Sequence, residues 1–176
     1  MKKLQLLAIS GSLRKASYNL TSLQALKLIS ANYIDINIVS LENLPLFNPD
    51  KEGDNIAAVL ALKDNIKQSD GLIIASPEYA HGISGVLKNA LDWLVSGEEF
   101  INLPIMLINT SPRASHAQLM LREVLVTMSA NIIEKATLTI PLLGSNKEKQ
   151  DIIADPTLSS QLDAALQHFK FAIAHR

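Results

Sequence analysis

The chain has 176 residues, of which 48% are hydrophobic and 19% charged, and its formal net charge is -1. This balance is typical of one soluble globular domain, spanning 1–176, and the near-neutral charge argues against a nucleic-acid partner. Because the sequence contains no cysteine, disulfide bonds, thiolate zinc sites and cysteine nucleophiles are excluded.

The first apolar run, Leu4 to Ile9, follows two lysines in the manner of a secretory signal. It is too short for one, however, and Gln5 lies within it, so a buried strand is the better interpretation. The sequence has no run of about 18 consecutive apolar residues that would suggest a membrane span. We therefore expect a cytoplasmic protein.

Further apolar runs alternate along the chain with stretches of helical spacing. In the most regular of these, 83–95, apolar residues recur at intervals of three and four, and polar residues fall on the other side. The predicted strands are 4–9, 35–40, 71–76, 103–110 and 136–140. The predicted helices are 17–32, 55–68, 83–95, 115–129 and 156–176.

This alternation predicts an α/β fold, a doubly wound five-stranded parallel sheet with helices on both faces and strand order 2-1-3-4-5. In such sheets ligands bind outside the carboxyl ends of the strands, at the switch point beside strand 1. Three loops occupy that edge: 10–19, 76–82 and 110–115.

The first of these loops reads "SGSLRKASYN" (10–19). Its serine and asparagine side chains and the guanidinium of Arg14 suit an anion at a helix N-terminus, where free N–H groups and the dipole attract negative charge. The same residues are equally consistent with a solvated turn followed by helix-capping residues. The loop contains neither Gly-x-Gly-x-x-Gly nor a P-loop motif, so a single terminal phosphate is the better fit.

The second loop opens the stretch "SPEYAHGISGVLKNALDWLV" (76–95). Ser76 is held extended by the following proline, and Gly82 relaxes the backbone before the helix. We therefore expect the backbone N–H groups of 78–82 to be free for a ligand. Tyr79 offers a flat face beside them, or packs on the end of the sheet.

These two stretches, "ISGSLRKASYN" and "SPEYAHGISGVLKNALDWLV", together closely resemble the NADPH-dependent FMN reductase family, which includes bacterial quinone, chromate and azo-compound reductases. The resemblance implies a flavodoxin-like fold that binds FMN. It places the phosphate in the first loop and the isoalloxazine ring against the second. The positions that correspond to the family's phosphate loop are Ser10, Ser12, Leu13, Arg14, Ser17 and Asn19.

The ring-contacting segment of the family corresponds to Pro77, Glu78, Tyr79 and Ala80. Many relatives have asparagine where this chain has Ala80, so only a backbone N–H can serve there. The resemblance also implies a homodimer or homotetramer built around this loop and the following helix. Glu78, His81 and Trp93 are therefore candidate subunit contacts.

The third loop, "NTSPRAS" (109–115), departs from the family, because many members have two adjacent glycines in a longer turn. Thr110 and Ser111 remain placed for the pyrimidine edge of the flavin. Arg113 has three possible roles: to stabilise the anionic reduced flavin, to bind the 2′-phosphate of NADPH, or to face solvent.

Neither a metal site nor a hydrolase is expected. The four histidines, 81, 116, 168 and 175, lack metal-ligand spacing, and no Gly-x-Ser-x-Gly elbow occurs. No catalytic side chain is expected either, because the cofactor carries the reaction.

The resulting hypothesis is an FMN-dependent enzyme that passes hydride from NADPH or NADH, through FMN, to quinones, flavins, azo compounds or metal oxyanions. One alternative is a flavodoxin-like electron carrier that does not itself oxidise NAD(P)H. Another is an interaction protein with a decayed site, which Ala80 and the short third loop make conceivable.

Overall fold

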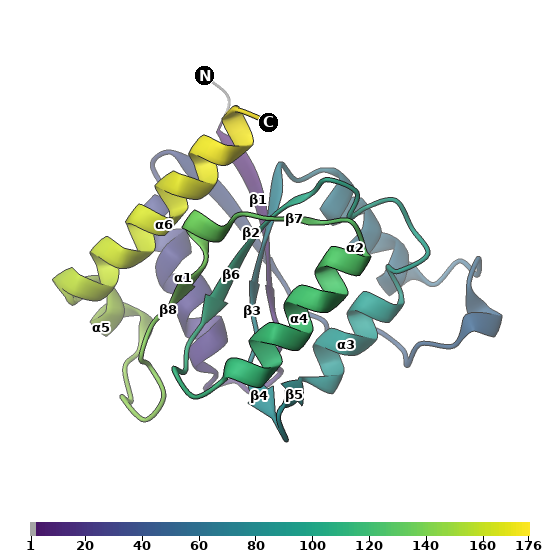
Figure 1. Cartoon of the computed structure of the whole chain (residues 1–176), viewed down its shortest axis with the longest axis horizontal. Helices are drawn as coiled ribbons and strands as arrows, with labels where there is room; N and C mark the ends of the chain where they lie inside the picture. Colours follow the sequence, from purple (N-terminus) through teal and green to yellow (C-terminus); the bar gives the residue numbers. More distant parts are fainter. Residues whose placement is uncertain (1–2) are drawn as a thin grey trace.

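A computed structural model describes residues 3–176, and its centre is a parallel sheet (Figure 1). Four strands form most of it in the order β2-β1-β3-β6, which is the predicted doubly wound arrangement. Their bounds are β1 (Leu4–Ser10), β2 (Ile34–Val39), β3 (Gly71–Ala75) and β6 (Pro104–Asn109). All four coincide with predicted apolar runs, so the prediction of fold class is confirmed.

The fifth position of the sheet is divided between two short strands, β7 (Asn131–Ile132) and β8 (Leu138–Thr139), which pair with opposite ends of β6. Between them lies a turn of 3-10 helix, η2 (Glu134–Ala136). The backbone N–H groups of Ala136 and Thr137 bond to the carbonyl of Ile133 in this turn. The continuous strand predicted at 136–140 is therefore wrong in its length, because local turn bonds replace its first ladder bonds.

Helices cover both faces of the sheet (Figure 1). One face packs against α1 (Tyr18–Ser30), α5 (Lys149–Ala154) and α6 (Pro156–Ala174). The other packs against α2 (Ala57–Lys67), α3 (Gly85–Asp92) and α4 (Ser115–Thr127). Within residues 3–176, no helix combines the length and the apolar character needed to cross a membrane.

The loop after β3 forms a small antiparallel hairpin, β4 (Glu78–Tyr79) with β5 (Gly82–Ile83). Its two turn residues, Ala80 and His81, have φ of 48° and 61°, as a two-residue turn of this type requires. The prediction that the N–H groups of 78–82 are free is therefore wrong for Tyr79 and Gly82, which pair with each other in the ladder. Ala80 and His81 lie outside the ladder.

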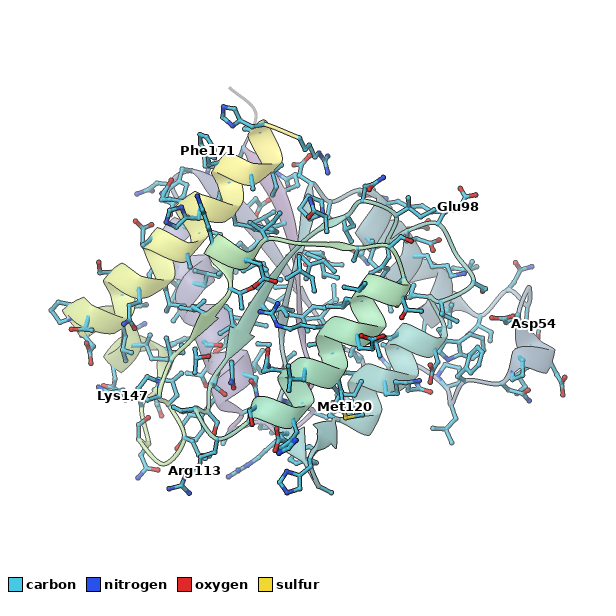
Figure 2. The ribbon with its side chains drawn as sticks, in the orientation of Figure 1. Asp54, Glu98, Arg113, Met120, Lys147 and Phe171 are labelled. Carbon is cyan, nitrogen blue, oxygen red and sulfur yellow. The ribbon has the colours of Figure 1, made fainter. Side chains whose placement is uncertain are left out.

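The segment 40–56 between β2 and α2 extends away from the sheet as an arm, with Asp54 near its outer end (Figure 2). It includes the short helix η1 (Pro49–Lys51). The side-chain oxygen of Asn89 on α3 accepts the backbone N–H of Phe47 in the arm at 2.7 Å. The indole N–H of Trp93 donates to the carbonyl of Pro45 in the arm at 2.8 Å. Trp93 is thereby buried inside its own chain, which is a correction to its expected place in a subunit contact.

Candidate functional site

The three predicted loops meet at the carboxyl edge of the sheet and enclose a cavity of about 290 Å³. Its lining comprises Ser12, Arg14, Ala16, Ser17, Tyr18, Asn19, Ser76, Pro77, Glu78, Tyr79, Asn109, Thr110, Ser111, Arg113, Ala114 and Leu143. Among the predicted site residues, Ser10, Leu13 and Ala80 are not part of this lining. The structure brings the other predicted residues together at the edge that the topology rule selects.

The start of the first loop is tied closely to the neighbouring strand end. The backbone N–H of Gly11 donates to the carbonyl of Ala75, the last residue of β3, at 2.8 Å. The buried hydroxyl of Ser10 accepts the N–H of Ser12 at 3.2 Å, so Ser10 shapes the turn rather than lining the cavity. Leu13 is half exposed on the outside of the turn.

The N-terminus of α1 faces the cavity without a side-chain cap. Ser17 occupies the N-cap position in extended conformation, but its side chain makes no capping hydrogen bond, and the first turn holds no acidic residue. Ser17 is buried and lines the cavity together with Tyr18 and Asn19 of the first turn of α1. Free donors and the positive end of the helix dipole make this end of the cavity suitable for an anion.

A buried hydrogen bond joins the first loop to the third. The hydroxyl of Thr110 donates to Oδ1 of Asn19 at 3.1 Å, and both side chains are buried. Since the acceptor oxygen of Asn19 is thus engaged, its amide NH₂ is left to donate toward a ligand.

Of the lining residues that sequence reasoning missed, Leu143 is brought to the cavity by the fold from a distant part of the chain. The carbonyl of Thr110 accepts the N–H groups of Leu142 and Leu143, at 3.1 and 3.2 Å, and so places the segment after β8 beside the cavity. Asn109 accepts the N–H of Ser111 through its side chain at 3.0 Å and shapes the third loop. The local sequence around Leu143 carries no signal of this placement.

Glu78 connects the hairpin to α4. Its carboxylate accepts the backbone N–H of Ala117, in the first turn of α4, at 2.8 Å. The N-cap residue of that helix, Ala114, has no acceptor of its own. This hydrogen bond, with the nearby rings of His116 and His81, holds the pKa of Glu78 below its ordinary value of 4.5. His81 Nδ1 lies 3.3 Å from the other carboxylate oxygen.

The substitution Glu78→Gln is expected to lower thermal stability at neutral pH, because a neutral amide accepts the Ala117 N–H less strongly. A folded-state pKa below the ordinary value means that the stabilisation by the carboxylate is complete above pH 4.5 and is lost as the pH falls through the lowered pKa. The difference in Tm between wild type and variant should therefore shrink on acidification. Thermal unfolding over an acid series, with Glu123→Gln on the exposed side of α4 as control, measures it; a Tm difference that stays constant with pH would contradict this role.

The described part of the chain, residues 3–176, contains no group of three histidine, aspartate or glutamate side chains placed to hold a metal ion.

Comparison with known proteins gives consistent matches. Residues 4–142 match the family described as NADPH-dependent FMN reductase. The quinone reductase of Escherichia coli K12 is 32% identical over 142 residues, covering 76% of each chain. An NAD(P)H-dependent FMN reductase of Pseudomonas aeruginosa is 30% identical over 171 residues, covering 93% of this chain and 92% of its own.

Solved structures share the fold. The NAD(P)H:acceptor oxidoreductase FerB of Paracoccus denitrificans superposes with a TM-score of 0.72 at 24% identity, covering 95% of this chain and 97% of its own. An archaeal flavodoxin superposes with a TM-score of 0.60 at 10% identity, covering 94% of this chain and 99% of its own. The arrangement of strands and helices is thus shared by flavin enzymes and flavin carriers.

Proposed function

This chain belongs to the NADPH-dependent FMN reductase family, and we propose how its cavity serves the reaction. The protein is an FMN-dependent oxidoreductase that takes hydride from NAD(P)H and passes it to a small-molecule acceptor. We propose that the whole chain, 1–176, acts as one FMN-binding domain. A cytoplasmic location belongs to the same proposal.

The observation that carries the proposed site is the uncapped N-terminus of α1 within the cavity. We place the FMN phosphate there. Ser12 and Ser17 donate through their hydroxyls and Asn19 through its amide, while Arg14 supplies the positive charge. Ser10 and Leu13 contribute through the turn conformation.

The flavin ring is proposed to lie toward the second and third loops. Pro77 and Tyr79 would contact it on the hairpin side, because both line the cavity. At its pyrimidine edge, Ser111 would donate through its hydroxyl, whereas Thr110, whose hydroxyl proton goes to Asn19, would accept. Glu78 positions the hairpin through α4, and the N–H of Ala80, outside the ladder, is available to the ring edge.

FMN, when bound, supplies both the acceptor and the donor of hydride. The chain's own residues bind and orient it and leave one side accessible. Tyr79 is 56% exposed, so its flat face can guide planar acceptors over the site. We propose quinones as the leading acceptor class, as the name of the Escherichia coli relative suggests, with flavins, azo compounds and metal oxyanions as further candidates.

An anaerobic assay tests this proposal. The purified protein loaded with FMN should oxidise NADPH on addition of a benzoquinone, and omission of either FMN or quinone should stop turnover. FMN binding with no NADPH oxidation would identify an electron carrier instead. A protein that stays free of flavin in excess FMN would support the decayed-site alternative.

We propose in addition that the enzyme is a homodimer, or a homotetramer built from such dimers. Leu119 and Val126 are 67% and 62% exposed on α4, and Met120 of the same helix lies beside Gly82 of the hairpin (Figure 2). An exposed apolar stripe next to a ligand site supports association there. The variant Leu119→Lys should shift the mass measured by light scattering toward the monomer, and the matched variant Leu28→Lys on α1 should not.

A further inference from the structure

A second cavity, of about 600 Å³, adjoins the proposed phosphate site. Its lining comprises Arg14, Lys15, Ala16, Tyr18, Thr21, Gln24, Asn146, Lys147, Glu148 and Lys149. Arg14, Ala16 and Tyr18 also line the first cavity, so the two spaces meet at the start of α1. We call the second space the basic groove.

The two walls of the basic groove are tied together. One wall is the outer side of α1, and the other is the segment that follows β8. The hydroxyl of Tyr18, the first residue of α1, accepts the backbone N–H of Asn146 at 3.1 Å. The second wall also reaches the first cavity, because Leu143 lines it. The groove is therefore a lateral continuation of the proposed FMN site.

The groove concentrates positive charge in a chain whose net charge is -1. Arg14, Lys15, Lys147 and Lys149 line it, against the single carboxylate of Glu148. Lys147 is held by Asp155, with Nζ 3.3 Å from a carboxylate oxygen. Among the ion pairs of residues 3–176, none involves the other three cations. Figure 2 shows Lys147 and Arg113, a lining residue of the first cavity, in the same lower left region of the molecule.

A single FMN phosphate at the N-terminus of α1 accounts for Arg14 but not for the three lysines farther along the groove. NADPH must place its nicotinamide at the flavin, so its adenosine end has to leave the first cavity. Arg14 and Tyr18 line both spaces, so the groove is an adjoining place for that end, and Arg14 reduces the repulsion between two phosphates bound on either side of it. The 2′-phosphate that distinguishes NADPH from NADH requires cations of this kind.

We propose that the basic groove binds the 2′-phosphorylated adenosine of NADPH, and that Lys15 and Lys149, from its two walls, give the enzyme its preference for NADPH over NADH. This proposal rests on the proposed function, because it assumes that hydride is delivered to FMN in the first cavity.

The test uses the FMN-loaded protein and the double variant Lys15→Gln/Lys149→Gln. Both side chains are exposed and belong to no ion pair, so the fold should tolerate the change. The ratio of kcat/KM for NADPH to that for NADH should fall about tenfold in the variant, as expected for losing two exposed charge contacts. The matched variant Lys51→Gln, in the arm at the other side of the molecule, should keep the wild-type ratio.

A direct binding measurement separates this site from turnover. By calorimetry, 2′,5′-ADP should bind the FMN-loaded wild type about tenfold more tightly than 5′-AMP, and the double variant should lose that difference. Equal binding of the two nucleotides to wild type would overturn the proposal. So would a variant that retains the NADPH preference.

FAD also carries an adenosine with phosphate groups, and it is therefore a second ligand whose chemistry suits the basic groove. If the apoprotein binds FAD much more tightly than FMN, and the double variant loses that advantage, the groove holds FAD and the NADPH assignment is wrong. Failure of wild type to bind FMN or to oxidise any reduced nicotinamide nucleotide would overturn the proposed function as well, whereas equal use of NADH and NADPH overturns only this inference.

Discussion

Replacing Gly11 by alanine is expected to weaken FMN binding by about a hundredfold, the upper range for forcing one methyl group into a packed site. A Cβ at this position would lie 2.5 Å from Oγ of Ser76 and 3.1 Å from Oγ of Ser84. Neither serine can move freely. Ser84 caps α3 by accepting the N–H of Leu87 at 3.2 Å, and Ser76 is buried at the end of β3.

The added methyl group would therefore push the first loop away from the second and break the alignment that the Gly11 hydrogen bond to Ala75 maintains. Fluorescence titration of the apoprotein with FMN measures the loss. Gly85→Ala is a matched control, because no neighbouring atom lies within 4 Å of an added Cβ there. If Gly11→Ala bound FMN like wild type, the close contact of the two loops would have no role in the site.

Arg14→Ala is expected to lower FMN affinity by about ten- to a hundredfold, the value of charge-assisted hydrogen bonds to one phosphate. Arg14 is the cation of the first loop that lines the cavity beside the N-terminus of α1. Because its side chain is exposed, added salt should reduce the difference between variant and wild type.

Arg14→Lys is the informative companion, since it keeps the charge and loses the planar fork. It should bind FMN with intermediate affinity. Titrations at low and high salt measure all three proteins, and an Arg14→Ala variant with unchanged affinity at low salt would show that Arg14 only screens the phosphate site from solvent.

The sheet was predictable because its central strands β3 and β6 are buried on both faces and read as continuous apolar runs. The runs 71–75 and 104–109 consist entirely of buried residues, and both were located from their letters alone. The division of the fifth strand was not predictable. The turn at Glu134–Ala136 is formed by local backbone hydrogen bonds, and the segment contains no glycine or proline that would indicate a turn.

The hairpin after β3 was missed for a different reason. Two-residue turns with positive φ usually carry asparagine, aspartate or glycine, whereas this chain has Ala80 and His81. Residues outside the turn support its strained conformation. The carboxylate of Glu78 accepts a backbone N–H of α4, and the ring of His81 lies beside the same carboxylate. Such support comes from tertiary contacts, which a local pattern does not express.

The candidate site was predictable to the extent that it follows from topology. The carboxyl edge beside strand 1 selects Ser17, Asn19 and Thr110 without knowledge of their contacts. Their contacts could be learned only from the structure: the Ser17 side chain makes no capping hydrogen bond, and Thr110 donates a hydrogen bond to Asn19.

If the N-terminus of α1 binds the phosphate of FMN, the protein should distinguish FMN from riboflavin. The two ligands share the ring and the ribityl chain and differ in the phosphate. Fluorescence titration of the apoprotein should give an affinity for FMN at least about a hundredfold higher than for riboflavin, because several charge-assisted bonds are made to the phosphate alone. Equal affinities for FMN and riboflavin would contradict the assignment of this loop as the phosphate site.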